Sequence, residues 1–299
     1  MSTIRRVFEA IAKDNLHTRR EIASSLGCSF VTVSKAVDKL ISCGLIASVD
    51  KNESDVGRRS DFLDISPSAC VLLINLCGEC LCYTISTLYD GSASARHLPY
   101  VDSLDFEDNF LLLIRDIKRR VITSPLKIAI ALPGDFKDGK LINAYINDYS
   151  GFNIIKMIGD YGINADVVVS AATAVEASPS FLSGDAFVCI SRSTWGTFGR
   201  GRIERLGKVT VDNRNLLDFD NAVCCSYDEN SIMEYSSRLL GIIDSVLSPE
   251  RILFSSKLMP DYKLNELASR SPKPIPVDDD EMILDGLMEL AATDILGEI

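Results

Sequence analysis

The sequence lacks any run of about 18 consecutive apolar residues, the length at which a segment is read as a transmembrane helix. Its N-terminus leads into a pattern with charges every few positions and has no unbroken apolar core of the signal-peptide kind. These absences predict a cytoplasmic protein with no membrane partner. The chain is 46% hydrophobic and 24% charged, which is enough apolar side chain for one small domain and one larger α/β domain.

Cysteine is plentiful, with nine residues, and several lie in apolar, strand-like runs. In a reducing cytosol, buried free cysteine behaves as a small hydrophobic residue. The spacing of Cys77, Cys80 and Cys82 also suits a redox or metal cluster, because Cys80 and Cys82 face the same side of a strand. The sequence favours packing for these residues and for the pair Cys224-Cys225, and we expect no cofactor.

The net charge of −11 opposes contact with nucleic acid unless the basic residues are unevenly distributed. Residues 1–65 carry ten Lys or Arg and nine Asp or Glu, and the remainder carries 21 basic and 33 acidic residues. An acidic body would be repelled by phosphate. Only the N-terminal segment is therefore expected to touch DNA.

Three short helices are predicted in this N-terminal segment. Thr3 is expected to cap the first, which runs to about Lys13. The segment Thr18–Glu21 has capping-box spacing and begins the second helix, which Gly27 ends. The third helix covers Ser29–Ser42, with Ser29 as its cap. Two helices joined by a glycine-containing turn are typical of a helix-turn-helix, in which the second helix reads DNA.

The outer surface of the third helix provides the candidate DNA contacts. Val33, Val37 and Leu40 form its apolar stripe and must face inward. Small hydroxyls and a lysine on the opposite side suit phosphates and base edges in a major groove. With two arginines from the preceding helix, the candidates in these helices are Arg19, Arg20, Ser29, Phe30, Thr32, Ser34 and Lys35.

A strand, a polar loop and a second strand follow the reading helix, which is the pattern of a wing. The strands are predicted at Leu45–Val49 and Phe62–Ile65. Arg58 and Arg59, at the descending edge of the loop, are placed to reach the DNA backbone or minor groove. Residues 1–66 are therefore predicted to form a winged helix-turn-helix domain. Many such modules bind protein instead, and that alternative stays open.

Residues 67–299 are predicted to form an α/β domain, because hairpins alternate with helix-linked strands. The acidic run Asp278–Glu281 is expected to cap the last helix, where carboxylates favour the positive N-terminus, although it could also attract a cation. The predicted strands are 70–76, 81–88, 127–132, 165–170, 186–190, 203–211 and 251–255, and the predicted helices are 106–121, 154–161, 171–177, 231–247, 263–270 and 281–296.

Five segments resemble motifs of the ROK family of sugar-responsive repressors and sugar kinases. They are Thr32-Val33-Ser34, Gly57-Arg58-Arg59, the strand-ending Pro133-Gly134, Val167–Ala174 and Leu247–Ile252. The resemblance implies an actin-like, hexokinase-like ATPase fold, with two α/β lobes around a cleft. It also implies that a sugar-like effector would bind between the lobes.

The chain departs from the family where a kinase would need its chemistry. The first phosphate loop appears as Asn75–Glu79, with an amide in place of a carboxylate and a glutamate that would repel phosphate. In the second loop, Trp195 would block the close backbone approach that phosphate requires. The family's catalytic Asn-Asp pair aligns with Ser170-Ala171, and alanine cannot accept a proton. A kinase activity is therefore not expected.

The resemblance also implies a structural zinc site, but its ligands are missing. Cys225 aligns with one ligand, whereas Tyr227 and Ile232 occupy two other ligand positions. His17 and His97 are the only histidines, and both are far away in sequence. We therefore expect no metal at that site. Glu234 aligns with the family's sugar-binding glutamate, but without its usual neighbours.

These observations predict a DNA-binding transcriptional regulator, a repressor of carbohydrate-related genes that binds double-stranded operator DNA. One winged helix makes few contacts, so the body is expected to form a homodimer or tetramer, using the helices at 231–247 and 281–296. Two interpretations of the body stay open: it binds an effector, which is a sugar-like or unidentified small molecule, or it serves only as a dimerisation scaffold. The alternatives are a catalytically dead sugar-kinase-like protein that uses its winged helix for protein interaction, and a degenerate sugar kinase.

Overall fold

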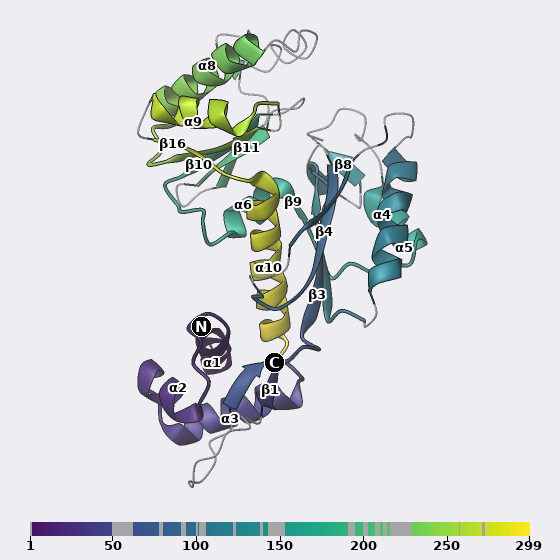
Figure 1. The fold of residues 1–299 in the computed structure, drawn as a ribbon, viewed down its shortest axis with the longest axis vertical. Coiled ribbons are helices and arrows are strands. Elements are labelled where there is room, and N and C mark those ends of the chain that lie inside the picture. The colour runs from purple at the N-terminus through teal and green to yellow at the C-terminus, as the bar shows by residue number, and fades with distance from the viewer. Residues whose placement is uncertain are drawn as a thin grey trace.

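The computed structural model describes residues 2–49, 62–77, 80–90, 94–99, 101, 106–121, 124–137, 140–142, 153–190, 195–199, 203–206, 210–211, 214–215, 229–256, 258–270 and 273–299. It is a mixed α/β structure with a small N-terminal head, defined as residues 2–49 and 62–65, and two lobes that are each built on a sheet (Figure 1). Among the described residues, no helix combines the length and the apolarity needed to cross a membrane.

The head contains α1 (Thr3–Ala12), α2 (Arg19–Leu26), α3 (Phe30–Ser42), β1 (Ile46–Val49) and β2 (Phe62–Ile65). The predicted helices are confirmed, with one correction. Ser2 caps α1 in place of Thr3, because its side chain accepts the Arg5 amide and so satisfies a free donor of the first turn. Thr18 and Glu21 form both halves of the predicted capping box. The two strands pair antiparallel, as a hairpin requires.

The first lobe is built on a five-stranded sheet in the order β5-β4-β3-β6-β9. These strands are β3 (Cys70–Asn75), β4 (Cys80–Thr87), β5 (Arg96–Pro99), β6 (Lys127–Leu132) and β9 (Val167–Ser170). The first three form an antiparallel meander, and β6 and β9 run parallel to β3. All six residues of the central strand β3 are buried, which explains why its first five, Cys70–Ile74, are apolar without alternation.

The second lobe repeats this topology, with a sheet in the order β12-β11-β10-β15-β16. Its strands are β10 (Ala186–Ile190), β11 (Trp195–Gly199), β12 (Ile203–Leu206), β15 (Ile252–Ser256) and β16 (Pro274–Pro276). Again an antiparallel meander is followed by two parallel strands. Two expectations were wrong here. Trp195, expected in a loop, begins β11, and the single strand expected at 203–211 is divided between β12 and β13 (Thr210–Val211).

Helices cover the outer face of each sheet. In the first lobe they are α4 (Phe106–Arg120) and α5 (Ile154–Asp160), and in the second they are α8 (Glu229–Leu247) and α9 (Asp261–Ser269) (Figure 1). The short hairpins β7 (Asp135–Lys137)–β8 (Lys140–Ile142) and β13–β14 (Arg214–Asn215) complete the described elements. The inner faces of both sheets pack on α6 (Ala171–Ala177) and α10 (Asp279–Gly297).

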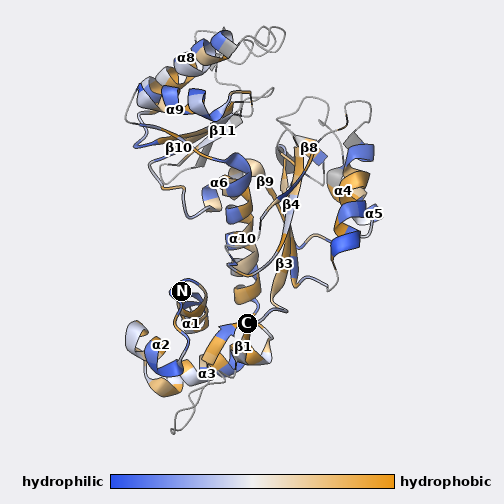
Figure 2. Cartoon of the chain, viewed as in Figure 1, coloured by the Kyte–Doolittle hydropathy of each residue, from blue (hydrophilic) through white to orange (hydrophobic). Residues whose placement is uncertain are grey.

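The last helix, α10, connects the three parts of the molecule. It starts beside the second lobe, packs on α6, β3 and β6, and ends next to the head, where the C-terminus lies (Figure 1). Most apolar residues of α10 are buried in the core, and they appear as orange bands along the helix (Figure 2). The prediction that α10 offers a stripe for dimerisation was wrong. The apolar residues of α8 that face its own sheet are buried as well, although Val246 is 61% exposed.

The head is docked against this helix by polar and aromatic contacts. Lys13 Nζ lies 2.6 Å from Glu289 Oε1, and Arg5 donates to Thr293 Oγ1 at 3.1 Å. Tyr89, which follows β4, donates its hydroxyl to the second oxygen of Glu289 at 3.0 Å, and Lys13 lies over its ring. The buried residues of the head belong to the same apolar cluster as α10. A displacement of α10 would therefore change its contacts with Lys13 and Arg5 of the head.

Candidate functional site

The exposed face of α3 is the candidate nucleic-acid interface. Val33, Val37 and Leu40 are fully buried, so the opposite side of the helix faces solvent as the sequence predicts. Of the candidates on α3 and its cap, Ser29, Phe30, Thr32 and Lys35 are exposed, and Ser34 is half-buried. Ser29 accepts the Thr32 amide, and the two hydroxyls share a hydrogen bond of 2.8 Å. The first turn of α3 therefore presents hydroxyls at a positively polarised helix end.

An apolar residue that sequence reasoning missed belongs to the same face. Val31 is 62% exposed and its neighbour Phe30 is 56% exposed, at the start of α3. Apolar side chains in a major groove can contact the methyl group of thymine. The missed signal is the position of Val31 two residues before the buried Val33, which turns it away from the core.

The four arginines among the candidate DNA contacts differ in where the structure places them. Arg19 is 19% exposed, donates to the Ser34 carbonyl at 3.2 Å and pairs with Asp38 at 2.8 Å, so its guanidinium ties α2 to α3. Arg20 is exposed at the start of α2. Arg58 and Arg59, predicted to lie on the wing, fall outside the described residues.

A second candidate site is a cavity of about 530 Å³ that follows α10 from its first turn to the joint with the head. Strands β3 and β4, residues before β5, and Tyr89 form its other walls. Its lining is strongly acidic, and Lys13 is the one lysine among the described residues that line it. The carboxylates are Asp90, Asp278, Asp280, Glu281, Asp285 and Glu289. Such a lining repels phosphate and favours a cation. Burial, together with the charges of Glu281 and Glu289, raises the pKa of Asp285.

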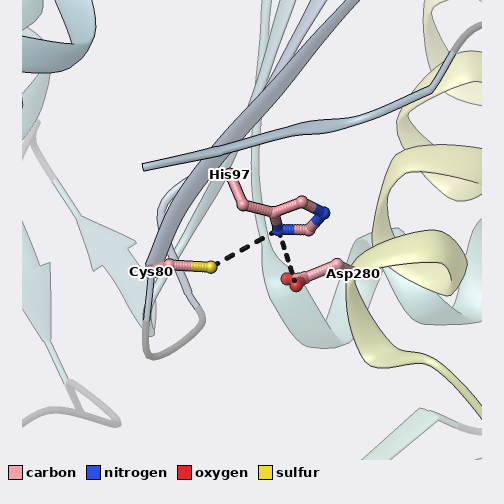
Figure 3. Close-up of side chains that lie close together, drawn as sticks. All are labelled: Cys80, His97 and Asp280. Atoms are coloured by element: carbon pink, nitrogen blue, oxygen red, sulfur yellow. Dashed lines mark hydrogen bonds and ion pairs between the residues drawn. The ribbon is translucent and has the colours of Figure 1, made fainter. Parts of the chain in front are cut away.

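Two residues of the lining, His97 and Asp280, lie close to each other and to Cys80 (Figure 3). His97 Nδ1 lies 3.4 Å from Cys80 Sγ and 3.5 Å from Asp280 Oδ2. Asp280 is 1% exposed, whereas His97 is 47% exposed. The prediction that the acidic run caps the last helix is confirmed by Asp278, which accepts the amides of Asp280 and Glu281. The sequence also allowed this run to attract a cation, but it did not identify Cys80 and His97 as neighbours of Asp280, because both come from distant strands.

The neighbouring thiols behave as the sequence predicts. Cys77 and Cys82 are buried, and burial, reinforced by the charge of Asp280, raises the pKa of both. Asn75 is also buried, donates to Asp280 Oδ1 at 2.8 Å and accepts the Cys77 amide. The resemblance implies a magnesium-binding carboxylate at position 75. In this structure the Asn75 amide at that position instead orients the carboxylate of Asp280 on α10.

The other residues that the resemblance singles out are dispersed or lie outside the described part of the chain. Ala171 is fully buried at the first position of α6, and Ser170 caps that helix. Glu234, aligned with a sugar-binding glutamate, is exposed on α8. Glu79, Cys225 and Tyr227 fall outside the described residues. The structure brings together no constellation for phosphoryl transfer among the residues that it describes.

Comparison with known proteins places this fold among ROK proteins. No family model and no curated protein sequence matches the chain. Among solved structures, it is similar to a ROK family transcriptional regulator, a homolog of the E. coli MLC protein, at 13% identity and a TM-score of 0.62; the match covers 98% of this chain and 96% of that one. It is also similar to a ROK family protein from Streptococcus pneumoniae TIGR4 in complex with sucrose, at 15% identity, 77% and 100% coverage and a TM-score of 0.47. A third is a ROK hexokinase from Thermus thermophilus, at 16% identity, 73% and 97% coverage and a TM-score of 0.45.

At these identities the comparisons establish the fold and nothing finer. The first match extends over the head as well as both lobes, since it covers nearly the whole of each chain. The expected likeness to ROK proteins is confirmed at the level of structure. The expected two-lobed α/β body agrees with the two sheets of matching strand order.

Proposed function

We propose that this protein is a DNA-binding transcriptional regulator whose head is a winged helix-turn-helix with α3 as the reading helix. The observation that carries the proposal is the arrangement of α3. Its apolar residues are fully buried, and its first turn presents Ser29, Phe30, Thr32 and Lys35 to solvent. The hairpin of β1 and β2 follows it in the order that a wing requires.

Within this proposal, the candidate residues have different tasks. Thr32, Lys35 and the apolar Val31 are placed to meet base edges and thymine methyls, and Arg20 is placed to meet phosphate. Arg19 acts by fixing α3 against α2, through Ser34 and Asp38. Arg58 and Arg59 are proposed to bind the backbone or minor groove.

The body is proposed to control the head and to pair two heads. A single head buries little DNA surface, so a homodimer gives a useful increase in affinity through effective concentration. The fold shared with a ROK transcriptional regulator supports this assignment, as does the direct contact of α10 with α1. We propose a repressor of carbohydrate-related genes on the basis of the ROK resemblance. A ligand in the acidic cavity would act through α10, whose Glu289 holds Lys13 of the head.

We further propose that the protein is not a sugar kinase. Ala171 cannot take a proton from a sugar hydroxyl. The Asn75 side chain already donates a hydrogen bond to Asp280 and accepts one from the Cys77 amide. The buried amide therefore has a structural partner in place of a magnesium ion.

The proposal can be tested by fluorescence anisotropy with a pool of labelled duplexes at several salt concentrations. The double variant Arg58→Ala/Arg59→Ala should weaken binding to all duplexes and lower the salt slope by about 1 for each phosphate that the protein no longer neutralises, whereas Lys35→Ala should change which duplexes are preferred. Lys156→Ala removes an exposed lysine from α5 in the body and should change nothing. If Lys35→Ala and the double arginine variant both bind like the unmodified protein, α3 and the wing do not contact DNA.

A further inference from the structure

We propose that Cys80, His97 and Asp280 form a binding site for a divalent transition metal, with Zn²⁺ as the best fit. The site is separate from the cysteine-based zinc site that the resemblance implies around Cys225. It combines a thiol, an imidazole and a carboxylate, which are the three ligand types that zinc accepts.

The spacing of the ligand atoms suits tetrahedral zinc. With Zn–S near 2.3 Å and Zn–N and Zn–O near 2.0–2.1 Å, tetrahedral angles place neighbouring ligand atoms about 3.3–3.6 Å apart. The distances from His97 Nδ1 to Cys80 Sγ and to Asp280 Oδ2 are 3.4 and 3.5 Å. All three ligand atoms lie within 4.8 Å of one another. An ion could therefore bind with only small side-chain adjustments.

The protein around the site orients the ligands. Asn75, itself fully buried, donates to Oδ1 of Asp280 and so turns Oδ2 toward His97. The backbone of Asp280 is fixed by its hydrogen bond to Asp278 at the start of α10. Cys80 and His97 lie on the paired strands β4 and β5, whose register sets Cys82 opposite His97. Outer partners of this kind are typical of metal sites, where they fix ligand orientation.

The surroundings supply the charge and the open position that such a site needs. His97 and Asp280 line the acidic cavity, so a cation there is attracted by the other carboxylates of the lining. The fourth coordination position would face this cavity and hold water or a small ligand. An ion at this position would link the edge of the first sheet to the first turn of α10, the helix that contacts the head at Glu289. The metal site itself does not depend on whether the head binds DNA.

The test uses the full chain without a histidine tag, stripped with a chelator, which is then titrated with Zn²⁺ in competition with a chromophoric chelator. We expect one tight site per chain. Cys80→Ser and His97→Gln should each weaken it by about tenfold or more, since even outer partners of a metal contribute 10–100-fold. Cys43→Ser alters an exposed cysteine of the head and should leave the affinity unchanged. Circular dichroism of each variant shows whether it has folded.

The visible spectrum of bound Co²⁺ provides a second readout, which would not change if Cys80 had a purely structural role. Co²⁺ added to the stripped protein should give the intense visible bands of a tetrahedral site and a thiolate charge-transfer band that disappears in Cys80→Ser. Absence of zinc binding at micromolar concentration would overturn the proposal. So would binding that persists unchanged in folded Cys80→Ser and His97→Gln, or a cobalt spectrum without the thiolate band.

Discussion

Gly286, in the middle of α10, marks the closest packing between that helix and α6. A Cβ added at this position would lie 1.7 Å from the carbonyl oxygen of Ala174 and 2.6 Å from its carbonyl carbon. The obstacle is backbone, so no side chain can rotate away to make room. Gly286→Ala should therefore force α10 and α6 apart.

The size of the effect follows from that distance. Ordinary carbon–oxygen contacts lie near 3.3–3.6 Å, so the helices must separate by about 1.6 Å or more. Extra methyl groups in packed cores typically cost about 1–3 kcal/mol, and a backbone clash of this depth should reach about 3 kcal/mol. At roughly 2–4 °C per kcal/mol for a protein of this size, the midpoint of thermal unfolding should fall by about 6–12 °C.

The matched control is Gly241→Ala, on the exposed side of α8, where a Cβ has nothing within 4 Å. The same substitution there should raise stability by about 0.5–1 kcal/mol, because alanine favours helix over glycine. Scanning calorimetry and urea unfolding measure both variants. If Gly286→Ala is as stable as the unmodified protein, then α10 and α6 do not pack as described, and the link from the lobes to the head is unsupported.

Three further predictions concern the head joint, a buried carboxyl and catalysis. Glu289→Gln weakens the charged contacts between α10 and the head and should lower stability by about 1 kcal/mol after screening. The control Glu266→Gln removes an exposed ion pair with Arg270 and should cost less than about 0.5 kcal/mol in urea unfolding. Burial raises the pKa of Glu176, against the opposing hydrogen bond from Thr197, so its charged form is penalised in the folded state. The unmodified protein therefore loses stability as the pH rises from the ordinary pKa of a glutamate through the raised pKa of Glu176. Glu176→Gln should have a higher melting temperature than the unmodified protein at pH 7 but not at pH 4. An equal difference in melting temperature at both pH values would contradict this. With Ala171 in the base position, calorimetry with ATP, magnesium and a panel of sugars should show no turnover, and measurable sugar-dependent hydrolysis would refute the proposal.

The head could be predicted almost completely from the sequence, because its signals are local. Ser29, Thr18 and Glu21 satisfy backbone groups within three residues, and Gly27 takes the left-handed conformation, φ +63°, that a tight turn requires. The one error, at Thr3, arose because two adjacent hydroxyl residues compete for the cap and either fits the pattern. Apolar periodicity then fixed which side of α3 is exposed.

The body was harder to predict because its decisive contacts join distant segments. β16 is three residues long and contains two prolines, so it carries no strand signal and exists because β15 lies beside it. The burial of α10 is set by both sheets, and its sequence alone does not distinguish a core helix from a dimer interface. The cluster of Cys80, His97 and Asp280 is formed by strand pairing and by the approach of α10, and no spacing in the sequence encodes it.

The most direct test of the central claim is selection of bound sequences from a random duplex library by the full-length protein at fixed salt. A paired, α3-based reader predicts enrichment of one motif made of two inverted half-sites, whose centres lie about one helical turn or a multiple of it apart. The motif should change at particular base positions when the selection is repeated with Thr32→Ala. If repeated rounds with folded protein enrich no sequence above the starting library, the protein is not the DNA-binding regulator proposed.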